Sequence, residues 1–147
     1  MAPVPADREE WAAVYTAFAI LRKETQRVFS RWGITTPQAT VLALLAEAKT
    51  PLTVSRLAQL MMHEVPSISS IIDRMSDAGM VERVKDNSDR RVTRIRLTNK
   101  GRKLHDSVRV AAVQVSEELF GVLSNEERAE LKELLQRFRR RNMQRLR

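Results

Sequence analysis

Arginines are concentrated in one short stretch of the chain, around a polar turn. Residues 84–98 read VKDNSDRRVTRIRLT, with arginine at positions 90, 91, 94 and 96. Asp, Asn and Ser are typical of tight turns, and guanidinium groups bind phosphate and are attracted to a narrow, strongly negative DNA minor groove. The stretch could therefore bind a polyanion, with Asp89 holding a neighbouring arginine in place. Taken alone, the same residues are explained more simply by a solvated hairpin whose charges only aid solubility.

The charge of the whole chain is concentrated in the same region. The 147 residues carry a net charge of +8. Residues 81–103 hold nine basic and three acidic side chains, whereas residues 1–80 hold eight of each. A second excess lies in residues 137–147, where six arginines could contact phosphate or simply form a solvated helix end. The clustering indicates a polyanionic partner, either nucleic acid or an acidic membrane surface.

Several kinds of functional site lack the residues they need. The sequence has no cysteine, which excludes disulfides and thiol chemistry, and only two histidines, His63 and His105. No nucleotide-binding or hydrolase motif is present. No apolar run approaches the ~18 residues of a membrane span, and the start does not read as a signal peptide. We therefore expect a cytoplasmic protein that is not an enzyme, with no metal, no cofactor and no membrane partner.

Helices must position the arginine-bearing stretch. Apolar side chains at alternating spacings of three and four residues, from Trp11 to Trp32, predict a long first helix that Gly33 ends. Thr36 followed by Pro37 predicts the N-cap and first turn of a second helix.

Two shorter helices are expected next. Thr53 can cap the third, and Pro66 can open a fourth that ends before Gly79. The predicted buried face of the fourth helix consists of apolar residues at helical spacing: Ile68, Ile71, Ile72 and Met75.

The periodicity then changes from that of a helix to that of a strand. Residues 80–85 and 92–97, separated by a turn at 86–89, predict a β-hairpin. Thr98 can cap a long helix after it, and Ser124 begins a capping box for the last helix. Three short helices followed by a two-stranded hairpin is the order of elements in a winged helix-turn-helix, whose third helix enters the DNA major groove.

Residues 67–101 resemble the recognition-helix and wing block of the MarR (multiple antibiotic resistance regulator) family. The matching features are Asp73-Arg74-Met75, Gly79 with Val81 and Arg83, Asp89-Arg90-Arg91, and Leu97-Thr98 followed by Gly101. The resemblance is strong over residues 34–106. It implies a mainly α fold with a small β-hairpin wing, and N- and C-terminal dimerisation helices.

The resemblance also implies how the chain is divided and what it does. Residues 1–147 would form a single MarR-like domain, with a winged-helix DNA-binding lobe at 34–98 and dimerisation helices at 6–33 and 99–147. We expect a homodimeric, sequence-specific regulator that binds a pseudo-palindromic operator in double-stranded DNA. It would most often repress a nearby operon and be released by a small molecule.

Roles for individual residues follow from the same resemblance. Arg91 would enter the minor groove, with Asp89, or Asp73 in the unbound state, as its ion-pair partner. Arg83 and Arg74 would contact phosphate or brace the protein. Serine at position 70, where several family members carry a basic residue, predicts modest direct readout. The expected DNA-binding residues are Ser67, Ser69, Ser70, Arg74, Arg83, Asp89, Arg90, Arg91 and Arg94.

Two further sets of residues are expected from the family pattern. An aromatic or carboxylate effector would lie in a crevice lined by Phe18, Arg22, Val41, Leu45, Leu104 and Val108. Arg22 could hold a carboxylate, although it reads equally well as a surface arginine beside a dimer seam. The expected dimer contacts are Val14, Phe18, Leu131, Leu134, Leu135 and Phe138.

Two other functions fit parts of this pattern. A basic protein could coat DNA or RNA without sequence preference, or an adaptor could have kept the fold and lost DNA binding. The presence of Arg91 together with Asp89 argues against the adaptor.

Overall fold

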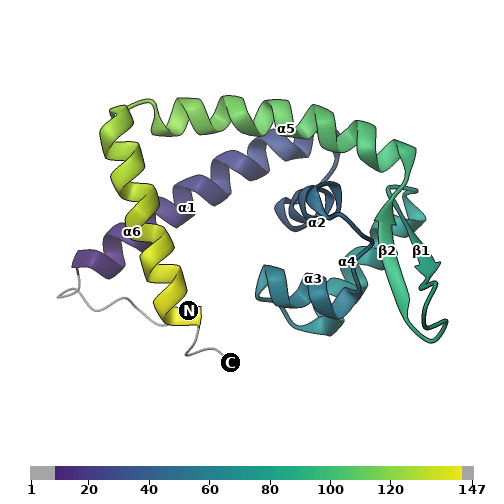
Figure 1. Ribbon diagram of the computed structural model, residues 1–147. Coiled ribbons are helices and arrows are strands. Elements are labelled where there is room, and N and C mark those ends of the chain that lie inside the picture. The colour runs from purple at the N-terminus through teal and green to yellow at the C-terminus, as the bar shows by residue number, and fades with distance from the viewer. Residues whose placement is uncertain (1–8, 144–147) are drawn as a thin grey trace. The chain divides into compact units, whose positions relative to one another are not determined.

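The computed structural model describes residues 9–143, which form helices and one β-hairpin (Figure 1). In chain order the elements are α1 (Glu9–Phe29), the 3-10 helix η1 (Ser30–Trp32), α2 (Thr36–Glu47), α3 (Val54–Met61), α4 (Val65–Asp77), β1 (Val81–Lys85), β2 (Thr93–Leu97), α5 (Asn99–Phe120) and α6 (Asn125–Met143). The predicted fold class, mainly α with a β-hairpin wing, is confirmed.

The chain divides into two compact units, Met1–Ala112 and Val113–Arg147. The first contains the expected DNA-binding lobe, α1 and the first part of α5. Residues 6–8 and 144–147 of the expected dimerisation helices lie outside the described residues. Among the described helices, none has both the length and the apolar character that crossing a bilayer requires.

Side-chain caps determine where the short helices begin. Thr53 accepts a hydrogen bond from the Arg56 amide at 3.1 Å, as predicted for α3. The cap of α2 is Thr35 and not Thr36, so that prediction was wrong by one residue. The Thr35 hydroxyl accepts from the Gln38 amide, and the Gln38 side chain accepts from the Thr35 amide at 2.9 Å. This reciprocal pair satisfies two backbone groups that Thr36, one residue later, could not reach in the same way.

The core of the first unit lies between α2, α3, α4 and the hairpin. The largest fully buried side chains, all apolar, are Ile34, Val41, Leu42, Leu57, Ile68, Ile72, Met75, Val81 and Ile95. Burying one such side chain stabilises the fold by about 1.5–3 kcal/mol. On α4 the predicted face is confirmed at Ile68, Ile72 and Met75, whereas Ile71 is half-buried.

The hairpin is joined to the helical lobe through backbone hydrogen bonds. β1 and β2 are antiparallel, with Arg83 opposite Ile95. On the side away from β1, the Ile95 amide donates to the Leu52 carbonyl at 2.7 Å, and the Leu52 amide donates to the Ile95 carbonyl at 3.1 Å. Because Leu52 directly precedes the α3 cap, the second strand is held to the segment that leads into the helix-turn-helix.

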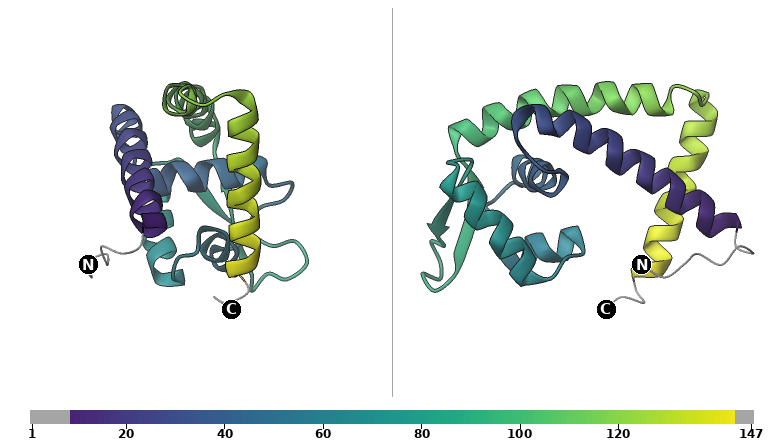
Figure 2. Two further views of the ribbon diagram at one scale, coloured as in Figure 1. Left: turned by 90° about the vertical axis from the view of Figure 1, so that its left-hand side faces the viewer. Right: turned by 180° about the vertical axis from the view of Figure 1, so that it is seen from behind.

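The second unit is a turn between two helices. Ser124 and Glu127 form the predicted capping box, with Glu127 accepting from the Ser124 amide at 2.8 Å. Arg128 donates to the Phe120 carbonyl at 2.9 Å and pairs with Glu117 at 3.0 Å. These contacts hold the start of α6 against the last turn of α5, and Figure 2 shows the short connection between these two helix ends.

We predict that Gly101→Ala destabilises the first unit. A Cβ at Gly101 would lie 1.9 Å from the Met80 carbonyl oxygen, a backbone atom that cannot easily move away. The Thr98 hydroxyl, which donates to Gly79 at 2.6 Å and accepts from the Gly101 amide at 3.0 Å, keeps this crossing tight. Overpacking should lower the free energy of unfolding by about 1–3 kcal/mol in urea titrations, although alanine favours helices.

The control is the exposed neighbour Arg102, whose replacement by alanine should change stability by less than about 0.5 kcal/mol. A Gly101→Ala protein as stable as the parent would contradict the close approach to Met80.

Candidate nucleic-acid interface

The exposed face of α4 carries small polar groups. Ser67 and Ser70 are exposed and Ser69 is half-buried. Within residues 9–143, none of the three hydroxyls makes a hydrogen bond. Arg74 is exposed on the same helix, and its Nε donates to the Ser70 carbonyl at 3.3 Å. The hydroxyls are therefore available to an external hydrogen-bonding partner.

An ion pair connects α4 to the hairpin. Arg83 on β1 donates to the Asp73 carboxylate on α4 at 2.6 Å. Of the two partners expected for Arg91, Asp73 is thus engaged elsewhere. The pair links the exposed face of α4 to the first strand, which agrees with local bracing, one of the two roles considered for Arg83.

The tip of the hairpin presents Arg91 to solvent. Asp89 accepts from the Arg91 amide at 3.0 Å and from its Nε at 3.2 Å, and the Arg91 side chain is 92% exposed. The hydrogen bond from the Arg91 side chain, and to a smaller extent that from the Arg91 amide, lower the pKa of the Asp89 carboxyl. The guanidinium is therefore oriented by an ionised carboxylate and remains accessible to a larger anion.

Asp86 organises the turn itself. Its Oδ1 accepts from the Ser88 amide at 2.8 Å and from the Asp89 amide at 2.9 Å, and its Oδ2 accepts from Arg94. The Asp89 amide, then Arg94 and the Ser88 amide, lower the pKa of Asp86 to about 2. Asp86 is therefore ionised at neutral pH.

The remaining arginines of the hairpin differ in their surroundings. Arg90 is exposed, and no partner for its side chain occurs among the described residues. Arg96 pairs with Glu82 across the strands at 2.8 Å. The guanidinium of Arg94 binds Asp86 and donates to the Pro51 carbonyl at 3.1 Å. Arg90 and the 92% exposed Arg91 thus lie at the tip, where an external anion can reach them.

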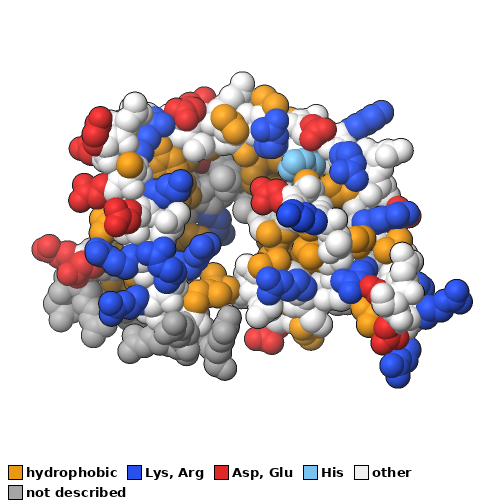
Figure 3. All heavy atoms as spheres, viewed as in Figure 1, with side chains coloured by type: hydrophobic (Ala, Val, Ile, Leu, Met, Phe, Trp, Pro, Cys, Tyr) orange, Lys and Arg blue, Asp and Glu red, His pale blue; other side chains and the backbone are white. Residues whose placement is uncertain are grey.

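The surface view shows Lys and Arg side chains gathered over the part of the first unit that carries the hairpin (Figure 3). Two exposed cations of the first unit were not predicted as site residues. Arg56 lies on α3, with its guanidinium 2.6 Å from the Gln59 side chain, and Lys100 donates to the Ala78 carbonyl at 2.6 Å. Their places in the sequence could have indicated them. Arg56 follows the α3 N-cap Thr53, and Lys100 follows Thr98 at the start of α5.

A cavity of about 600 Å³ lies within the first unit, beside α1. Its lining residues come from α1, the start of α2 and the end of α3: Phe18, Leu21, Arg22, Thr25, Gln26, Thr36, Pro37, Thr40, Met61 and His63. Sequence reasoning missed most of them, because their convergence depends on how α1 crosses α2.

The expected effector residues divide into two groups. Phe18 and Arg22 line the cavity. Val41, Leu45 and Val108 do not, because they are buried in the core, and Leu104 is half-buried away from this lining. A helical stripe indicates burial, but it does not distinguish a cavity wall from a filled core.

Gln26 connects the cavity to the helix-turn-helix. Its side-chain oxygen accepts from the Thr36 amide at 3.0 Å, and its nitrogen donates to the Ile34 carbonyl at 3.3 Å. One half-buried amide on α1 thereby holds the start of α2.

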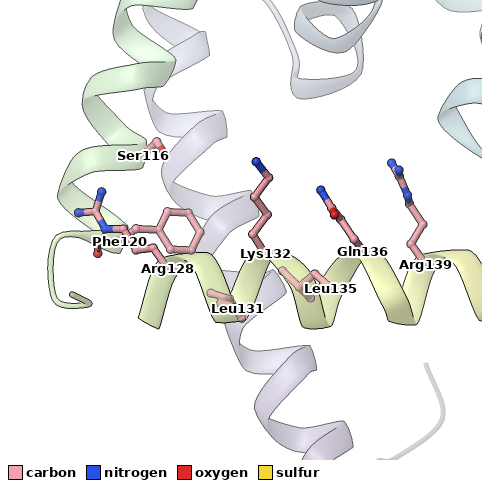
Figure 4. A pocket seen from close by; sticks show the side chains of 8 residues that line it. All are labelled: Ser116, Phe120, Arg128, Leu131, Lys132, Leu135, Gln136 and Arg139. Atoms are coloured by element: carbon pink, nitrogen blue, oxygen red, sulfur yellow. Dashed lines mark hydrogen bonds between the residues drawn. The ribbon is translucent and has the colours of Figure 1, made fainter. Parts of the chain in front are cut away.

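Apolar side chains are exposed on both units. Val14 and Phe18 of α1 and Leu134, Leu135 and Phe138 of α6 are all exposed. In the second unit Leu131 and Leu135, with Phe120, form the apolar part of a groove of about 390 Å³, beside Lys132, Gln136 and Arg139 (Figure 4). The expected dimer residues thus lie on faces that this chain leaves largely uncovered.

Metal ligation has no candidate in the part of the chain that the structure describes: no three His, Cys, Asp or Glu residues converge there. His63 lines the cavity beside α1, and His105 contacts Asp106 at 3.3 Å.

Comparisons with known proteins identify the family. Residues 32–92 match the sequence model of the MarR family. The helix-turn-helix transcriptional regulator YsmB of Bacillus subtilis is 31% identical over 109 residues, which is 74% of each chain. The chain belongs to the MarR family. It is accordingly a DNA-binding transcriptional regulator with a winged helix-turn-helix.

Two solved structures have the same fold. A mutant of MarR from E. coli complexed with operator DNA has a TM-score of 0.79 and 22% identity, and the match covers 86% of this chain and 91% of that one. CouR from Rhodococcus jostii, bound to p-coumaroyl-CoA, has a TM-score of 0.81 and 20% identity, with 92% and 94% covered.

We predict that Arg91→Ala weakens operator binding by about 1–3 kcal/mol, the range for a specific guanidinium contact. Its side chain is exposed, so thermal unfolding should be unchanged. Fluorescence anisotropy on a duplex selected from random sequences would measure the affinity. Ser70→Ala should alter base preference more than affinity, and Arg137→Ala on α6 is the charge-matched control. Parental affinity in Arg91→Ala would contradict the predicted contact of Arg91 with the minor groove.

Proposed function

We propose that this MarR-family regulator binds a pseudo-palindromic operator as a homodimer and represses a nearby operon until a small molecule releases it. The observation that carries the proposal is the pairing of two exposed features on one lobe. The serine face of α4 suits base edges in the major groove, and Arg90 and Arg91 suit the adjacent minor groove. The Asp73–Arg83 ion pair connects the two elements that carry them.

A two-fold dimer would supply a second DNA-binding lobe for the second half-site of the operator. The exposed apolar side chains of α1 and α6 call for a covering surface, and a second copy of the chain supplies one. In a dimer, the two α4 helices would enter successive major grooves about 34 Å apart.

Release by a ligand is supported by the cavity beside α1. Phe18, Pro37 and Met61 provide apolar walls, and Arg22 provides a guanidinium that suits a carboxylate. Gln26 lines this cavity and holds the start of α2. A ligand that competes for Gln26, or displaces α1 from the start of α2, would therefore favour a different placement of the helix-turn-helix.

Coating of nucleic acid without sequence preference is the rival function, and competition separates the two. We expect the parent protein to retain a selected operator in a large excess of random DNA at fixed salt, because contacts to bases add to the contacts to phosphate. Equal competition by random DNA would favour the coating protein.

Sedimentation tests the dimer. The parent should be a dimer at micromolar concentration, and Phe138→Asp should shift it toward the monomer, because Phe138 is 65% exposed in the single chain. Arg140→Ala on the same helix is the control. A stable parental monomer that binds operator tightly would contradict the proposed assembly.

Ligand binding to the cavity gives a separate test. Aromatic carboxylates should bind weakly by calorimetry and lower operator affinity, and Arg22→Ala should reduce this effect without changing DNA binding in the absence of ligand. Binding that leaves operator affinity unchanged would remove the effector role from this cavity, and the DNA-binding proposal would stand.

A further inference from the structure

The hairpin contacts the segment before α3 at two successive residues of β2. Ile95 exchanges backbone hydrogen bonds with Leu52. The preceding residue, Arg94, donates from its guanidinium to the Pro51 carbonyl at 3.1 Å. Side chain and backbone therefore join the same strand to the same segment, which leads into the helix-turn-helix.

The second partner of Arg94 is the residue that shapes the turn. Asp86 Oδ2 accepts from Arg94, and Oδ1 accepts from the amides of Ser88 and Asp89. One carboxylate thus ties the tip of the hairpin to Arg94, and Arg94 ties it to Pro51. This chain of contacts, from the turn through Asp86 and Arg94 to Pro51, is here called the Asp86–Arg94 clasp.

The side chains of the clasp are less exposed than Arg91 at the tip. The Asp86 side chain is 14% exposed and that of Arg94 is 35% exposed, whereas Arg91 is 92% exposed. An arginine that is mostly covered and holds two partners is poorly placed for a phosphate. It is well placed to limit movement of the hairpin relative to the helical lobe, because a two-stranded ribbon has little rigidity of its own.

We propose that the Asp86–Arg94 clasp sets the position of the wing tip relative to α4, so that Arg94 and Asp86 are positioning residues for DNA binding. The proposal rests on the proposed function of the lobe. It replaces a direct role for Arg94 with an indirect one, exerted through Arg90 and Arg91.

The direction in which one substitution changes operator affinity distinguishes this proposal from simple charge attraction. Asp86→Asn removes a negative charge from the wing, and attraction to DNA alone would then strengthen binding. Asparagine keeps an oxygen for the Ser88 and Asp89 amides, but its NH2 group then replaces Oδ2 and cannot accept a hydrogen bond from Arg94. The clasp therefore predicts weaker operator binding, by about fivefold or more, the lower end of the loss expected for a guanidinium contact.

The matched control lies on the same hairpin. Glu82→Gln also removes one negative charge and releases Arg96, but it leaves the clasp intact. Operator affinity in this variant should be unchanged or slightly higher. If Asp86→Asn behaves like Glu82→Gln, the clasp has no positioning role.

A double-mutant cycle tests whether Arg94 acts through the tip. Arg94→Ala should weaken operator binding in the parent, yet have little effect in a protein that already carries Arg90→Ala and Arg91→Ala. If the losses from Arg94 and from the tip multiply, Arg94 contacts DNA directly and the proposal is overturned.

Hydrogen exchange in the free protein supplies a readout that needs no DNA. Asp86→Asn and Arg94→Ala should each speed exchange of the Leu52 and Ile95 amides about tenfold, since a charge-assisted bond no longer opposes opening. The α4 amides, measured in the same sample, should be unaffected. Unchanged exchange at Leu52 and Ile95 would overturn the clasp, whereas a parent that shows no operator preference would overturn the proposed function alone.

Discussion

The arrangement of the lobe depends on how a hairpin of two short strands is kept in place. Such a hairpin is marginally stable in water on its own. Ile95 stabilises the hairpin in two ways. Its side chain is fully buried, and its backbone forms hydrogen bonds with Leu52 on the edge away from β1. The buried side chain anchors the strand in the core made by α2 and α4. The backbone bonds add a single-residue β-bridge to the two-stranded ribbon, and this bridge joins β2 to the entrance of α3.

Much of the fold could be predicted from the sequence, because the signals that define its elements are local. Thr53, Pro66 and Ser124 mark helix starts through groups within three residues of themselves, and the turn at 86–89 separates two runs of strand-forming residues. The cap of α2 was placed one residue late because adjacent threonines offer the same hydroxyl. Only the partner decides between them, and Gln38 closes its reciprocal bond with Thr35.

The site was less predictable, because its geometry depends on contacts between elements. Arginine spacing in the hairpin does not reveal that Arg94 reaches Pro51, forty-three residues earlier in the chain. Nor does it reveal that Asp73 is occupied by Arg83, which leaves Asp89 to orient Arg91. The same limit applies to the cavity beside α1. Val41 and Leu45 have the spacing expected of cavity-lining residues but fill the core, whereas Gln26, an unremarked polar residue, joins the cavity to α2.

The division of α4 into two faces has a consequence for how such regulators diversify. Ile68, Ile72 and Met75 hold the helix in the core, while the side chains at the exposed positions 67 and 70 make no hydrogen bonds within residues 9–143. Substitutions at exposed positions of this kind usually change stability by less than about 0.5 kcal/mol. After a gene duplication, each copy can therefore vary these two side chains one at a time while remaining folded. Divergence of the paralogues at this face is limited by selection on what they bind, and hardly at all by the requirement to fold.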